Sequence, residues 1–277
     1  MLIEAVATPK PGLVDMCDQG AHSDMDLYTF IDSSFELFRY MYGFAEIGWN
    51  FDNKDLRQLF FDIRELGLSS ERDMLRVTGG ANTQKGLNFS LGCICASSGY
   101  LLSNNKELNA ESITDTVSKM TEGLCERELE PLLKKEKPKE ELTAGEKLFI
   151  EYGVKGIRGE AESGFISAVT YGLPILSKAG RLSNEVVIDA LLNLMENVVD
   201  TNVLHRCGDK GLELMRKSAG YARQLGGIKT EKGKEHLRCM NKQFIDCNIS
   251  PGGCADLLAI SIMLYLLCNE TWSLGYQ

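Results

Sequence analysis

The stretch LNFSLGCICASSGYLL, residues 87–102, is apolar or small on nearly every side of a helix. A surface helix keeps one polar face, so this stretch predicts a helix that other helices surround. A second segment of the same kind, CADLLAISIMLYLL, spans residues 254–267. Together they predict an all-α protein with two apolar central helices, starting near Lys85 and Gly252.

Apolar residues outside these segments recur at intervals of three and four, which is the spacing of amphipathic helices. Thr143 and Glu146 have the spacing of a capping box, Ser183 is placed to start a helix, and Gly67 to end one. No alternating strand pattern or internal repeat is evident, and the charged stretch KKEKPKEE, residues 134–141, predicts a surface loop. We therefore expect a single compact all-helical domain over residues 1–277. The further helices are expected at 23–48, 53–67, 113–124, 143–153, 183–198, 209–227 and 237–244.

Composition and charge narrow the classes of function. A net charge of −9 and a pI near 5.0 argue against nucleic-acid or membrane-surface partners. The nine cysteines contain no C-x-x-C pair, which indicates a reducing compartment without disulfides or a zinc site. The apolar run at the amino end is too short for a signal peptide, and the longest apolar run is too short to span a bilayer. We expect a soluble cytoplasmic protein.

Five glycine-rich polar clusters are richer than turns require. They are TPKPGLVD at 8–15, GAHSDMD at 20–26, TGGANTQKG at 78–86, GIRGEAESG at 156–164 and SPGGCAD at 250–256.

Each cluster also has a plain structural interpretation. Ser23 and Asp26 fit a capping box, and Ser250 fits an N-cap with Pro251 just inside the helix.

The glycines at 252 and 253 are poor helix formers, so a ligand or another backbone is expected to come close to them. Asp256 lies one turn into an apolar helix, where an unpaired carboxylate is unfavourable. We expect a partner for Asp256, either Lys85, Arg158 or a metal ion.

TGGANTQKG has the composition of a phosphate-binding loop, because its glycines, hydroxyl groups and lysine stand at the start of a buried helix. The free backbone amides at that helix start would point toward a bound anion. The P-loop pattern is not present, since Lys85 does not follow a glycine. Among the histidines, His22 lies inside a cluster and is a candidate for function, His205 is ambiguous, and His236 is expected to face solvent.

Six motifs, TPKPGLVD, GAHSDMD, TGGANTQKG, GIRGEAESGF, DTNVLHR and SPGGCADLLA, occur in the order and spacing of the triphosphoribosyl-dephospho-CoA synthase family. The chain resembles this family over nearly its whole length. The resemblance implies an all-helical enzyme that converts ATP and 3′-dephospho-CoA to 2′-(5″-triphosphoribosyl)-3′-dephospho-CoA and adenine. The product would be the prosthetic-group precursor for the acyl carrier subunit of citrate lyase or malonate decarboxylase, delivered by a downstream holo-acyl-carrier transferase pathway.

The implied reaction needs cations and amides for the triphosphate, a base for the attacking hydroxyl and a donor for the departing adenine. Mg²⁺ would accompany ATP, with Asp24 and Asp26 as its candidate ligands. The candidate catalytic residues are Asp15, His22, Glu160 and Asp256. The candidate substrate and phosphate ligands are Lys10, Thr78, Gly79, Gly80, Asn82, Thr83, Lys85, Arg158, Asn202, Arg206, Ser250, Gly252 and Gly253.

Two positions depart from the family pattern. Gln84 stands where the family has histidine, and a glutamine cannot act as a general acid. Cys207-Gly208 replaces a glycine pair.

Two other interpretations of the function remain open: a Mg²⁺-dependent nucleotide or ADP-ribose glycohydrolase, and a non-catalytic nucleotide-binding helical protein. A homodimer is one possible assembly, and the five clusters are predicted to converge on one pocket.

Overall fold

The computed structural model describes residues 1–133 and 142–269; the predicted surface loop at 134–141 lies outside this part. Every regular element of the described residues is helical, which confirms the all-α prediction. None of these helices is long and apolar enough to cross a membrane. The α-helices are α1 (Leu2–Val6), α2 (Leu27–Trp49), α3 (Leu56–Val77), α4 (Lys85–Ser103), α5 (Ala110–Met120), α6 (Leu124–Glu128), α7 (Ala144–Tyr152), α8 (Gly156–Glu162), α9 (Leu173–Ala179), α10 (Asn184–Asn197), α11 (Thr201–Gln224), α12 (Glu231–Asp246) and α13 (Gly252–Cys268).

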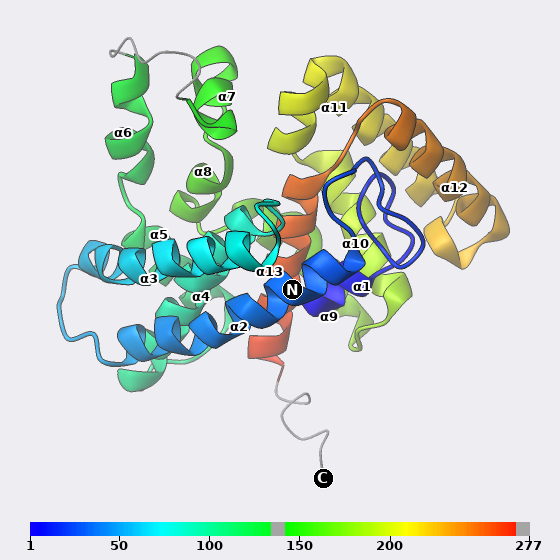
Figure 1. Cartoon of the computed structure of the whole chain (residues 1–277). Helices are drawn as coiled ribbons and strands as arrows, with labels where there is room; N and C mark the ends of the chain where they lie inside the picture. Colours follow the sequence, from blue (N-terminus) through cyan, green and yellow to red (C-terminus); the bar gives the residue numbers. More distant parts are fainter. Residues whose placement is uncertain (134–141, 270–277) are drawn as a thin grey trace.

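The two apolar segments form α4 and α13, which begin at the predicted residues. In Figure 1, α13 runs through the middle of the molecule, with α2 to α5 on one side and α10 to α12 on the other. Both helices contribute long runs of buried residues to one continuous hydrophobic core. Glycines allow close approach there: a Cβ on Gly48 of α2 would lie 1.9 Å from the Ala96 carbonyl oxygen of α4. The sequence pattern therefore places the core correctly.

Several predicted helix ends are wrong. The helix through Gly67 continues to Val77, because Gly67 faces open space and no turn residue follows it. The cap of α2 is Asp26 paired with Thr29 in a capping box, so Ser23 does not start that helix. The predicted boxes at Thr143 and the cap at Ser183 are confirmed.

α11 starts earlier than predicted, at Thr201, with Asp200 as its cap. It is interrupted at Gly208, whose φ of 62° and ψ of −165° are not helical, so the Cys207-Gly208 departure falls at a kink. A short π-helical turn (Ala168–Gly172) and the 3₁₀ turns Glu130–Leu133 and Gly227–Lys229 join other helices.

Candidate active site

Asp200 joins the amino-terminal ends of α11 and α13. Its Oδ1 accepts a hydrogen bond from the Val203 amide at 3.0 Å, and its Oδ2 accepts one from the Cys254 amide at 2.7 Å. One carboxylate thus caps two helices at once. Burial raises the pKa of Asp200, although these amides favour its charged form. The sequence motifs contain Asp200 at the start of DTNVLHR, but its role as a double cap was not anticipated.

The glycine pair that opens α13 leaves room for the start of α11, which packs directly against it. A Cβ on Gly252 would lie 2.1 Å from Nδ2 of Asn202, and one on Gly253 would lie 3.1 Å from Oδ2 of Asp200. The expected close neighbour at these glycines is therefore protein. Asn202 is placed at this junction and remains a candidate ligand.

Asp256 lies one turn further along α13, where its carboxyl group meets the start of α4. A Cβ on Gly86 would lie 2.6 Å from Asp256 Oδ2. Burial raises the pKa of Asp256 well above its usual range, and the negative charges of Glu4 and Asp200 raise it further. Neither of the two expected cations pairs with Asp256: Lys85 pairs with Glu71 and Arg158 with Glu128. Burial and the two neighbouring acids therefore favour the protonated form of Asp256.

Asp256 and Glu160 line the same cavity, of about 570 Å³, between α8 and the start of α13. Glu160 accepts hydrogen bonds from Ser167 through its hydroxyl at 2.5 Å and its amide at 3.2 Å. Burial nevertheless raises the pKa of Glu160 above its ordinary value. Lys155 and Tyr171 also line this cavity, and neither of them belongs to a polar cluster that the sequence singles out. We call it the carboxyl cavity.

A second cavity, of about 280 Å³, holds the cations; we call it the basic cavity. Glu128 accepts from Arg158 Nε at 2.8 Å and from Arg64 Nη1 at 2.6 Å. Burial acts to raise the pKa of Glu128, but the two guanidinium groups reverse the effect and lower it. Lys85 pairs with Glu71 at the rim of the same cavity.

The two cavities are neighbours. Ile157, in the first turn of α8, lines both of them. Gly86 lines the basic cavity and abuts Asp256, which lines the carboxyl cavity. The basic cavity also has an apolar wall that includes Phe60 and Phe89, and the Oδ1 atom of Asn88, which lines it, is buried without a hydrogen-bond partner. Three of the five clusters thus meet at adjoining cavities rather than in one pocket.

Only some of the polar groups in the loop before α4 make hydrogen bonds within the protein. Gly79 and Gly80 adopt positive φ, of 63° and 95°, with open space where a side chain would be. The Thr78 hydroxyl donates to the Ala81 carbonyl at 2.6 Å, and Asn82 Oδ1 accepts from the Lys85 amide at 3.3 Å. The buried Thr83 Oγ1 has no hydrogen-bond partner. The open space at this loop therefore lies beside the backbone of Gly79 and Gly80.

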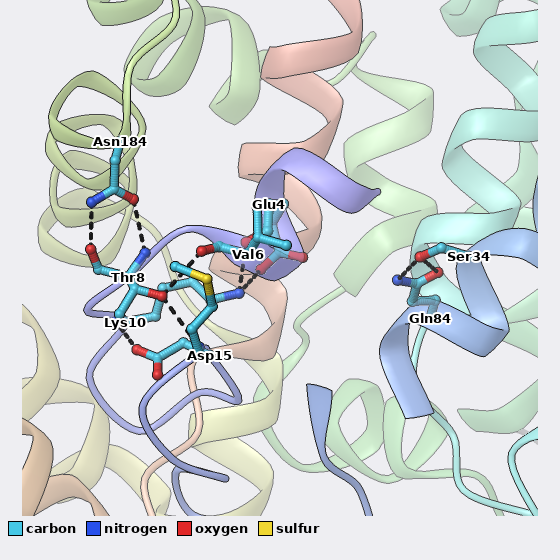
Figure 2. A network of polar contacts seen from close by, with 9 residues as sticks. Glu4, Val6, Thr8, Lys10, Asp15, Ser34, Gln84 and Asn184 are labelled. Atoms are coloured by element: carbon cyan, nitrogen blue, oxygen red, sulfur yellow. Dashed lines mark hydrogen bonds and ion pairs between the residues drawn. The ribbon is translucent and has the colours of Figure 1, made fainter. Parts of the chain in front are cut away.

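Gln84, the departure from the family pattern, faces inward. Its Nε2 donates to Ser34 Oγ of α2 at 3.1 Å, on the right of Figure 2. Both side chains are buried, so the glutamine joins α4 to α2.

The first polar cluster forms a buried turn. Lys10 Nζ donates to Glu4 Oε1 at 2.6 Å, and the Lys10 amide donates to Asp15 Oδ2 at 2.8 Å (Figure 2). Asp15 Oδ1 also accepts from the Cys17 amide at 2.6 Å. Neither Lys10 nor Asp15 lines the two cavities, and both are almost fully buried. The structure gives Lys10 a carboxylate partner in place of a phosphate.

The second cluster meets Ser250 and Arg206. His22 Nε2 lies 2.7 Å from Ser250 Oγ, and its Nδ1 lies 3.5 Å from Asp24 Oδ1. Burial first, and then the charge of Arg206, lower the pKa of His22. Arg206 donates to the Ala21 carbonyl and to Asn248. Ser250 is fully buried and makes no cap bond to α13, so its predicted capping role is wrong and it instead fixes the 20–24 loop.

The candidate metal ligands Asp24 and Asp26 lie at the start of α2. Asp26 Oδ1 is occupied by the Thr29 amide at 2.8 Å and the Thr29 hydroxyl at 2.8 Å, while Asp24 is exposed. Among residues 1–133 and 142–269, no group of three or more histidine, cysteine, aspartate or glutamate side chains could hold a metal ion.

Comparison with known proteins identifies the class. A model of the CitG family, ATP:dephospho-CoA triphosphoribosyl transferase, matches residues 1–274. A Vibrio cholerae protein assigned as a 2-(5″-triphosphoribosyl)-3′-dephosphocoenzyme-A synthase is 36% identical over 270 residues, covering 96% of this chain and 85% of the relative. A Lactiplantibacillus plantarum protein of the same assignment is 37% identical over 267 residues, covering 96% and 93%.

A crystal structure of an Archaeoglobus fulgidus protein, assigned as a triphosphoribosyl-dephospho-CoA synthase, superposes with a TM-score of 0.53 at 19% identity. It covers 86% of this chain and 98% of that one, and it shows the shared fold alone. Together with the match over residues 1–274, the sequence relatives establish that the chain belongs to the CitG family of triphosphoribosyl transferases.

Proposed function

We propose that this chain joins the triphosphoribosyl group of ATP to the 2′-hydroxyl of 3′-dephospho-CoA and releases adenine. The family match over residues 1–274 carries the reaction. The two carboxyl groups with raised pKa in the carboxyl cavity supply the acid and base that it needs. The product is the precursor of a prosthetic group, for citrate lyase or malonate decarboxylase, which a downstream holo-acyl-carrier transferase would consume.

The bond changes assign roles to the two carboxyl groups. The 2′-oxygen of dephospho-CoA forms a bond to the anomeric carbon of ATP while the bond from that carbon to adenine breaks, and adenine keeps the electron pair. Asp256, whose pKa is raised more strongly, is the acid that donates a proton to the departing adenine. Glu160, fixed by Ser167, accepts the proton of the attacking hydroxyl.

The basic cavity would receive phosphates next to the reacting ribose. Its cations already have carboxylate partners, so a phosphate must compete with Glu71 for Lys85 and with Glu128 for Arg158. The ion pair between Lys85 and Glu71 is the easier of the two for a phosphate to break, because the Lys85 side chain is half exposed. The 78–84 loop leads directly into Lys85, and its glycines Gly79 and Gly80 face open space, so its backbone amides would complete this phosphate site.

Magnesium would enter with ATP rather than occupy a site of its own. Mg²⁺ takes most of its ligands from phosphates and water, with one or two carboxylates. Asp24, which is exposed, stays a candidate ligand of the ion.

The decisive experiment incubates the purified chain with ATP, Mg²⁺ and 3′-dephospho-CoA and follows adenine release and the ribosylated product by mass spectrometry. Asp256→Asn and Glu160→Gln are each expected to lower kcat by roughly 10²–10⁴-fold, because each removes a proton-transfer group. Glu185→Gln changes an exposed carboxylate on α10 and should leave kcat unchanged.

Two outcomes would contradict the proposal. Free ribose triphosphate with no coupled product would indicate a hydrolase. Full activity in both carboxamide variants, with coupled product formed, would keep the reaction and remove the assigned roles.

A further inference from the structure

The outer side of α2 carries a line of large aromatic side chains that nothing in the described structure covers. Their exposed fractions lie between 55% and 76%. Figure 1 shows α2 on the near face of the molecule. The buried side of the same helix, with Leu37, Phe44 and Gly48, packs on α4. We call the exposed line the aromatic stripe; its members are Tyr28, Phe35, Phe38, Tyr42 and Trp49.

The stripe follows the helix axis closely. Four of its members are separated by seven residues each, which is close to two helical turns, and Phe38 fits between them. Heptad spacing of apolar residues is the pattern by which two helices pair. Isolated exposed aromatics need no explanation, but a continuous exposed stripe marks an interaction surface.

The area of the stripe fits a protein partner. An aromatic side chain offers about 150–250 Å², so at these exposed fractions the five rings leave roughly 700 Å² open. A stable interface buries about 800 Å² on each partner. The exposed charged residues beside the stripe include two acids, Asp32 and Glu46, and one base, Arg39, and the whole chain is acidic, so an anionic lipid surface would gain little attraction.

The seven-residue spacing of Tyr28, Phe35, Tyr42 and Trp49 is the same from either end of α2. In an antiparallel pair about a two-fold axis, Tyr28 would oppose Trp49 of the second copy, and Phe35 would oppose Tyr42, with Phe38 near the axis. A two-fold interface requires one patch that is complementary to itself. We propose that the aromatic stripe of α2 is a homodimer interface in which two copies of this helix pair antiparallel.

Sedimentation velocity of the full chain over micromolar concentrations tests the proposal. The wild type is expected to sediment at twice 30.7 kDa. Phe38→Glu and Phe35→Glu should each weaken the dimer by about a hundredfold or more, because the interface would carry two unpaired carboxylates. Ile245→Glu, an equal change at an exposed apolar residue of α12, should remain dimeric. Far-UV circular dichroism checks that each variant is folded.

A charge pair tests the antiparallel register. Tyr28→Lys and Trp49→Glu should each weaken the dimer, and the double variant should regain it, since each new lysine meets a glutamate of the other copy. A parallel pair would bring lysine against lysine and show no recovery.

A monomeric wild type would overturn the proposal, whether or not it binds vesicles of anionic lipid. Dimers that persist in both glutamate variants would overturn it as well, because the interface would then lie elsewhere. Single variants that weaken the dimer without recovery in the double variant would overturn the antiparallel register.

Discussion

Lys85 occupies a position where structure and binding compete. It starts α4, lines the basic cavity and is half exposed, but its ammonium group contacts the carboxylate of Glu71. An exposed ion pair of this kind contributes about 0–1 kcal/mol. A phosphate, with its larger charge, can therefore displace Glu71 at small cost in free energy.

Lys85→Ala is expected to weaken ATP binding by roughly ten- to a hundredfold, since a charge-assisted contact to phosphate contributes about 1.5–3 kcal/mol. Calorimetry measures the affinity. Lys54→Ala, an exposed lysine that lines neither cavity, is the matched control. Unchanged ATP affinity in a folded Lys85→Ala variant would show that this lysine serves only the fold.

Two helix starts meet at the proposed catalytic group. The first turn of α4 offers Gly86 to the carboxyl group of Asp256, which lies in the first turns of α13. Asp200 holds the start of α13 against α11. The position of the Asp256 carboxyl group therefore depends on three helix ends, and a single methyl group can disturb it.

Gly86→Ala should keep the fold, because alanine favours a helix by about 1 kcal/mol over glycine, and yet lower kcat by roughly a hundredfold. The new Cβ would lie 2.6 Å from Asp256 Oδ2 and must displace it. Gly145→Ala on α7 meets open space and serves as the control in the same kinetic assay. An unchanged kcat for Gly86→Ala would argue against Asp256 as the proton donor.

The whole molecule carries an excess of buried acids near its centre. The negative charges of Glu4 and Asp200 act on Asp256, while Lys10 is paired with Glu4. Burial raises the pKa values of Asp200 and Asp256, so the folded chain keeps protons that the unfolded chain has lost. The free energy of unfolding consequently falls as pH rises from the ordinary aspartate value of 3.8 to the raised values, and it stays low above them.

Asp256→Asn removes one of these protonation equilibria. The variant should be more stable than the wild type at neutral pH, by about 1–3 kcal/mol, because the wild-type carboxyl group must take up a proton when the chain folds and an amide need not. The difference should shrink as pH falls toward 3.8, while the contribution of Asp200 is common to both proteins. Urea unfolding at a series of pH values measures it. Parallel pH profiles for the two proteins would refute the buried-acid explanation.

The sequence by itself determined the helical class, the two central helices and the residues at which they start. These follow from local periodicity: a segment that is apolar on all sides has no stable place except the core. The six motifs also determined the family. Helix ends were predicted less well, because Asp26 and Asp200 compete with other cap residues that only packing can exclude.

Only the tertiary structure decided which polar clusters line the cavities and which of them form hydrogen bonds and ion pairs within the fold. Lys10 and Asp15 have the composition of a site, but the fold pairs them with Glu4 and with backbone amides. Asp256 was expected to need a cation, and the fold instead raises its pKa by burial and neighbouring acids. Pairing and desolvation depend on distances between residues far apart in the chain. A one-dimensional pattern records which groups are present, while the packed helices fix which of them remain free to act.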